Sequence, residues 1–197
     1  MRLDRLRIVL WMAALIATIA FTVFQLRPGN PILATTAAST FAPTFRLADG
    51  EGRIRDSNEF RDRWLLVFFG FTYCPEVCPT TLSDISLWLD GLGAAADRLN
   101  VALITVDPER DTVAALADYL TYFDPRITGH TGTPEEIARA TEAFRVRVER
   151  QPLGEDDYTM DHTSGVFLFR ADGSFGSIID YHEDRAFALP KIRRVLT

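Results

Sequence analysis

The chain has 197 residues, of which 47% are hydrophobic and 24% are charged, the length and balance of one globular domain with a short additional segment. Four of the 21 basic residues and one of the 27 acidic residues lie in the first 27 positions, so the remainder carries a net charge of −9. An acidic domain of this kind excludes a typical nucleic-acid-binding protein.

The N-terminus contains a long apolar run. Residues 8–26 are nineteen residues without a charged side chain, enough for a helix to span a bilayer, and they exceed the apolar core of a cleaved signal peptide. Arg2, Arg5 and Arg7 precede the run, which predicts that residues 1–7 stay in the cytoplasm. We therefore expect an uncleaved, single-pass transmembrane anchor in the inner (cytoplasmic) membrane, with the C-terminal domain in the periplasm.

The segment after the apolar run is rich in Ala, Thr and Pro and has no periodic apolar pattern. This composition predicts that residues 27–43 form a tether and that a single domain spans residues 44–197. At the start of the domain, Asp49 and Gly50 separate two short segments, 45–47 and 53–55, a pattern typical of a hairpin.

Two apolar segments, 64–69 and 101–106, lack alternation, which predicts strands covered by helices on both faces. Apolar residues at helical spacing predict a helix from about Pro79 and another over residues 113–123. The charged turn 107–112 between the second strand and its helix is interpreted mainly as a helix cap. The alternative is that this turn supports the cysteines from outside the ligand set or docks a partner protein.

The C-terminal part begins with a capping pattern, Thr133-Pro134-Glu135-Glu136, which predicts a helix to about Val148. Segments 165–169 and 174–181 flank a turn and predict an antiparallel hairpin, and residues 186–195 predict a closing helix. The order β-α-β-α-β-β-α predicts an α/β fold, a thioredoxin-like mixed sheet flanked by helices.

The two cysteines of the chain, Cys74 and Cys78, follow the presumed central strand, at the edge where open α/β sheets place their sites. If Cys78 precedes the first helical turn, the helix N-terminus should lower its pKa. The pair is compatible with a structural disulfide, a redox dithiol or a metal site. A disulfide would close too short a loop to stabilise much, and redox pairs typically have two intervening residues rather than three.

A metal site would need a third ligand from among three histidines, His130, His162 and His182. We interpret His130 as a partly buried loop residue and His182 as a solvated turn residue. His162 leads directly into the predicted hairpin, so its loop could approach the cysteines. Two thiolates and one imidazole favour copper in an exported protein, with zinc as the less favoured alternative.

Four segments resemble the Sco/SenC family of copper-binding assembly factors of cytochrome c oxidase. They are Leu66–Pro75, Val77–Pro79, Thr105–Thr112 and Asp161–Thr163. The resemblance implies a membrane-anchored, thioredoxin-like domain that binds Cu(I) or Cu(II) through Cys74, Cys78 and His162. It also implies that the protein helps to load the binuclear copper centre of cytochrome c oxidase subunit II, with copper received from an upstream donor.

The leading hypothesis is thus a metallochaperone rather than an enzyme. The alternative is a thiol-disulfide oxidoreductase that reduces the target cysteines of that subunit with Cys74 and Cys78 as its dithiol. A peroxidase would need an activated cysteine with a nearby arginine, for which Arg110 is a weak candidate.

Overall fold

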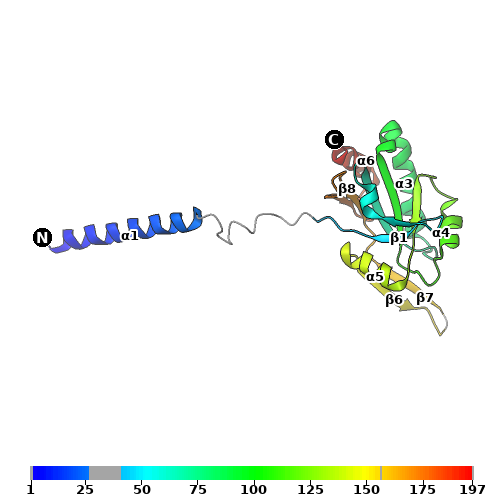
Figure 1. The fold of residues 1–197 in the computed structure, drawn as a ribbon, viewed down its shortest axis with the longest axis horizontal. Coiled ribbons are helices and arrows are strands. Elements are labelled where there is room, and N and C mark those ends of the chain that lie inside the picture. The colour runs from blue at the N-terminus through cyan, green and yellow to red at the C-terminus, as the bar shows by residue number, and fades with distance from the viewer. Residues whose placement is uncertain (1, 27–40, 156, 197) are drawn as a thin grey trace. The chain divides into compact units, whose positions relative to one another are not determined.

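The computed structural model describes residues 2–26, 41–155 and 157–196, and the chain divides into two compact units, Met1–Thr40 and Phe41–Thr197. The first unit contains helix α1 (Arg2–Leu26), shown in blue in Figure 1. Among the described residues, no helix is long and apolar enough to cross a membrane. The predicted anchor over residues 8–26 is therefore not supported, and tether residues 27–40 lie outside the described part.

The second unit is built on a five-stranded mixed sheet in the order β5-β4-β3-β8-β9. Strands β3, β4 and β5 run parallel, while β8 is antiparallel to β3 and to β9. The predicted mixed sheet and its terminal hairpin are confirmed. The bounds are β3 (Trp64–Gly70), β4 (Leu99–Thr105), β5 (Ile127–His130), β8 (Val166–Phe169) and β9 (Phe175–Ile179).

Helices flank this sheet (Figure 1). They are α3 (Val77–Leu92), α4 (Val113–Leu120), α5 (Pro134–Ala143) and α6 (Arg185–Val195), with short 3-10 turns at Ser57–Phe60 and Gly93–Arg98. Successive side chains of β3 point to opposite faces. A side chain on Gly70 would point at Cys78 of α3, whereas the Phe69 ring lies 5.2 Å from that of Phe144, just beyond α5. Strand β3 is therefore buried on both sides, which explains its unbroken apolar sequence.

Two small hairpins complete the unit. The first pairs β1 (Arg46–Ala48) with β2 (Ile54–Asp56), as predicted. The second pairs β6 (Val148–Pro152) with β7 (Tyr158–His162) and projects beside α5 in Figure 1. It was not predicted.

The position of β6 corrects one predicted boundary. The cap at Thr133 is confirmed, because its hydroxyl accepts the N–H of Glu136 and the Glu136 carboxylate accepts the N–H of Thr133. The helix ends at Ala143, however, and not near Val148. Arg145 adopts a φ of 57°, a left-handed conformation that does not continue a right-handed helix.

Candidate metal centre

The cysteine loop connects β3 to α3. Cys74 lies in this loop and is partly buried, whereas Cys78 lies in the first turn of α3 and is fully buried. Both are free thiols. The helix begins at Val77, two residues before the predicted start at Pro79, so Cys78 is inside the helix and Cys74 faces its N-terminal end.

This placement makes Cys74 the acidic thiol. Its pKa is lowered to about 6, chiefly by the hydrogen bond from the Cys78 side chain and also by the backbone N–H groups of Glu76, Val77 and Cys78, which outweigh its partial burial. The Cys78 N–H lies 3.3 Å from Sγ of Cys74. Unpaired N–H groups at a helix N-terminus stabilise a thiolate in this way.

Cys78 behaves in the opposite manner. Its pKa is raised by its hydrogen bond to Cys74, by burial and by the negative charge on Cys74. The prediction of a lowered pKa assumed that Cys78 precedes the helix; Cys78 instead lies in the first turn of α3, and its hydrogen bond to Cys74 and its burial raise its pKa. At neutral pH the metal-free pair is thus one thiolate and one thiol.

His162 is the last residue of β7 and not part of a loop. Its Nδ1 lies 3.0 Å from the carbonyl oxygen of Thr163; a carbonyl only accepts, so Nδ1 carries the proton. Burial lowers the pKa of the imidazole. The neutral ring therefore keeps the lone pair on Nε2, the state in which histidine binds a metal.

Phe71 links the three predicted ligands. Its carbonyl accepts the N–H of Cys74, its backbone hydrogen-bonds the Cys78 sulfur, and its ring lies edge-on to His162 with centroids 6.0 Å apart. Even so, no group of three or more His, Cys, Asp or Glu side chains in the described ranges is arranged to hold a metal ion. The structure brings the two cysteines together, and His162 contacts the ring of Phe71 in the same loop.

A buried carboxylate holds the start of the cysteine loop. Asp111 is fully buried; it accepts from the N–H of Thr72 at 3.1 Å, from the hydroxyl of Thr72 at 2.5 Å and from the hydroxyl of Thr105 at 2.6 Å. Its pKa is nevertheless raised, because burial outweighs these bonds. The next residue, Thr112, caps α4, as predicted for this turn, but sequence reasoning missed the role of Asp111.

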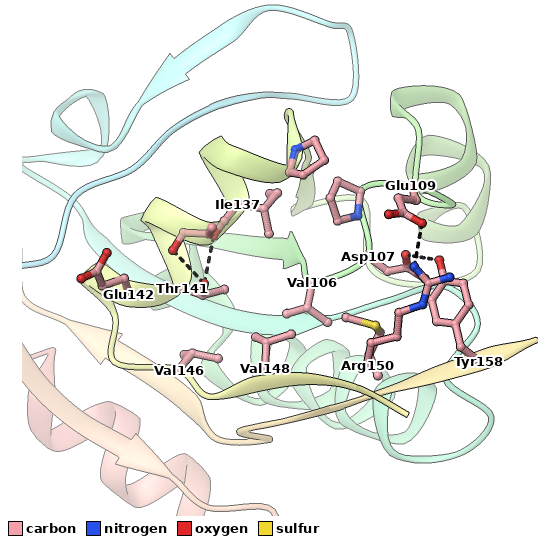
Figure 2. A pocket seen from close by; sticks show the side chains of 14 residues that line it. Val106, Asp107, Glu109, Ile137, Thr141, Glu142, Val146, Val148, Arg150 and Tyr158 are labelled. Carbon is pink, nitrogen blue, oxygen red and sulfur yellow. Dashed lines mark hydrogen bonds and ion pairs between the residues drawn. The ribbon is translucent and has the colours of Figure 1, made fainter. Parts of the chain in front are cut away.

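The same turn contributes a cluster of charged and aromatic side chains. Asp107 is buried and accepts from Arg110 and from the hydroxyl of Tyr158 at 2.8 Å. Arg150 lies against the Tyr158 ring, 3.5 Å from its centroid, and pairs with Glu109 at 3.1 Å. Figure 2 shows Asp107, Glu109, Arg150 and Tyr158 at one end of a groove of about 400 Å³ whose remaining lining is mostly apolar.

Tyr119 also lies near the cysteines without having been predicted. Its pKa is raised by burial and then by the charges of Cys78, Cys74 and Asp111, and its buried hydroxyl has no hydrogen-bond partner among the described residues. The sequence gives no signal that Tyr119 would lie near the cysteines, since a tyrosine at an apolar position of a helix is common.

The other two histidines lie elsewhere. His182 is exposed in a turn, as predicted. His130 is not a partly buried loop residue: it lies in β5 and is 1% exposed, between the rings of Phe45 and Phe60. Burial lowers its pKa to about 4.

Comparison with known proteins identifies relatives of the whole second unit. The SCO1/SenC family model matches residues 33–197. The protein SCO2 homolog, mitochondrial, of Bos taurus is 42% identical over 134 residues, covering 66% of this chain and 50% of the relative. The chain thus spans about half the length of the curated relatives it matches.

Two solved structures share the fold at substantial identity. Bradyrhizobium japonicum ScoI with copper bound is 39% identical with a TM-score of 0.72, over 78% of this chain and 98% of that chain. Yeast Sco1 with copper bound is 31% identical with a TM-score of 0.72, over 78% of this chain and 86% of that chain. Because the family model matches residues 33–197 and these relatives share sequence and fold over most of the second unit, the chain belongs to the SCO1/SenC family.

Proposed function

We propose that the protein is a copper metallochaperone that holds copper through Cys74, Cys78 and His162. The observation that carries the proposal is the thiolate-thiol pair at the N-terminus of α3, together with the neutral His162 imidazole, which contacts Phe71 of the same loop. Two sulfurs and one nitrogen suit copper, whereas structural zinc takes four protein ligands. Relatives described with copper bound support the same metal.

The two cysteines would bind the metal from different protonation states. Cys74 offers a thiolate at neutral pH, while the raised pKa of Cys78 means that metal binding must displace its proton. Because no three-ligand set is already assembled among the described residues, the proposal requires a local adjustment of the cysteine loop or of β7 when copper binds.

The small number of protein ligands would allow copper to be transferred to a recipient protein. A three-ligand site leaves room for an incoming thiolate, so copper can pass to cysteines of a recipient by stepwise ligand exchange. We take the recipient to be the binuclear copper centre of cytochrome c oxidase subunit II and the source to be an upstream copper donor, as the family resemblance implies. The periplasmic location remains a prediction from the sequence.

Metal reconstitution tests the ligand set. The reduced protein is reconstituted anaerobically with Cu(I), Cu(II) or Zn(II), and its metal content is compared with that of Cys74→Ala, Cys78→Ala and His162→Ala. We expect roughly one copper per chain, as a single three-ligand site would hold, and loss of stable binding in all three variants. Unchanged copper retention in His162→Ala would remove the histidine from the ligand set.

A thiol-disulfide oxidoreductase is a second candidate, favoured by the lowered pKa of Cys74. The Cys74 thiolate would attack a target disulfide and form a mixed disulfide with release of one target thiolate. Cys78 would then lose its proton and attack Cys74, which releases the second target thiolate and leaves a Cys74–Cys78 disulfide. The target gains the two electrons that the pair loses. Retained disulfide exchange in His162→Ala, together with lost copper, would separate the two activities.

A further inference from the structure

Arg110 contacts its own turn and two segments that are distant in sequence. Its guanidinium lies 4.5 Å from the ring centroid of Tyr73, in the cysteine loop, and 3.8 Å from that of Tyr158, on β7. Its Nε donates to Asp107 and its Nη1 donates to the Tyr158 carbonyl at 3.0 Å. The side chain is only 17% exposed, so these contacts form in a largely dehydrated setting where they are strong.

Asp107 completes a triangle with Arg110 and Tyr158. One carboxylate oxygen accepts from Arg110 and the other from the Tyr158 hydroxyl, and Figure 2 shows the Asp107 and Tyr158 side chains directed toward one another. The backbone N–H of Asp107 donates to the Thr105 hydroxyl at 2.9 Å, which fixes the turn at the end of β4. Tyr158, the first residue of β7, thus attaches this strand to the turn at the carboxyl end of β4.

The attachment of β7 at Tyr158 affects the position of His162, because both residues lie on the same strand. Residues i, i+2 and i+4 line one face of a strand, so Tyr158, Met160 and His162 share a face of β7. Tyr73, whose ring also contacts Arg110, is bonded directly to Cys74. Arg110 therefore lies between the strand that carries the histidine and the loop that carries the first cysteine.

We propose that Arg110 is a positioning residue whose guanidinium holds β7, and with it the imidazole of His162, against the cysteine loop. The inference rests on the proposed copper ligands and adds a residue that acts on them through Tyr73 and Tyr158. It accounts for an arginine in the turn 107–112, where a helix cap alone would require only Thr112.

The first test uses the metal-free, full-length protein and follows amide hydrogen exchange along β6 and β7. In Arg110→Ala we expect exchange about tenfold faster across the hairpin, because such local opening is governed by the few contacts that close it. Arg147→Ala is the matched control, since the exposed Arg147 side chain, just before β6, pairs with Glu149 and has no other side-chain partner among the described residues. It should leave the exchange unchanged.

The second test follows the nitrogen ligand in the Cu(II)-loaded protein by electron paramagnetic resonance. In Arg110→Ala we expect weakened nitrogen coupling and an about tenfold loss of copper affinity, as is usual for groups that orient a ligand, with the sulfur-to-copper absorption retained. Arg110→Lys keeps a cation beside Asp107 and hence the fold, but a single ammonium cannot span Asp107 and the Tyr158 carbonyl. It should show the same changes to a smaller degree.

Two results would overturn the inference for different reasons. If the wild-type protein shows nitrogen coupling, and exchange and coupling in Arg110→Lys and Arg110→Ala equal those of the wild type, Arg110 does not position His162. If the wild type itself lacks nitrogen coupling, His162 is not a ligand, and the proposed ligand set fails together with this inference.

Discussion

The Cys78 thiol occupies the space that a side chain on residue 70 would need. A Cβ atom placed on Gly70, the last residue of β3, would lie 3.1 Å from Sγ of Cys78 and 3.0 Å from the ring of Phe68. Real Cβ atoms rarely approach this closely, and the surrounding core is well packed. The glycine thus allows helix α3 to bring its cysteine onto the end of the central strand.

Gly70→Ala should therefore displace Cys78 and weaken both the fold and the metal site. We expect a loss of about 1–3 kcal/mol in the free energy of unfolding, the usual cost of inserting a methyl group into a packed core, and a lower copper affinity. Chemical denaturation and copper competition measure the two effects. Gly50→Ala is the control, since a Cβ there would meet nothing within 4 Å; equal effects in both variants would contradict this account.

The acidity of Cys74 should depend on its neighbour. Alkylation of the wild-type protein should show a midpoint near the Cys74 pKa of about 6. In Cys78→Ala the midpoint should rise toward the ordinary thiol value of about 8.5, because the largest stabilisation of the thiolate, the Cys78 hydrogen bond, is lost. The rate of iodoacetamide reaction against pH measures it. A midpoint that stays near 6 would assign the effect to the backbone N–H groups alone.

Asp111 should stabilise the loop through its three hydrogen bonds. Asp111→Ala leaves the buried Thr105 hydroxyl and the two Thr72 donors without their acceptor, at a cost of about 1–3 kcal/mol for each group that stays unpaired. Asp111→Asn should cost less, because it keeps an acceptor and removes a charge that burial disfavours. Urea unfolding measures both, with the exposed Asp118→Ala as the control; equal losses for Asn and Ala would count against the network.

Much of this fold is predictable because its signals are local. The unbroken apolar sequence of β3 and the capping residues around Thr133 each depend on neighbours in the chain, and both predictions were confirmed. The β6–β7 hairpin depends instead on contacts between distant residues, such as Tyr158 with Asp107, and it was missed. A lowered pKa was predicted for Cys78 but is found at Cys74. The helix begins at Val77, two residues before the predicted start, and this places Cys78 inside the helix.

The last prediction concerns the buried His130 and the stability of the fold in acid. The Thr128 hydroxyl donates to the Val101 carbonyl, so Nε2 of His130 must donate to the Thr128 oxygen. Its Nδ1 is then unprotonated, and it has no hydrogen-bond partner among the described residues. Protonation would place a charge in the apolar surroundings of Phe45 and Phe60.

The pKa of His130 is about 4 in the folded protein, against about 6.5 in an unfolded chain. Between these values the unfolded chain binds a proton that the folded chain does not, so the contribution of His130 to stability falls as the pH is lowered from 6.5 toward 4 and changes no further below. The shift corresponds to about 3 kcal/mol. His130→Phe, which fits the aromatic surroundings, should flatten this part of the curve of unfolding free energy against pH, while the lowered pKa of His162 leaves a residual slope of the same sign. An identical slope in His130→Phe and wild type would mean that His130 titrates normally in the folded protein.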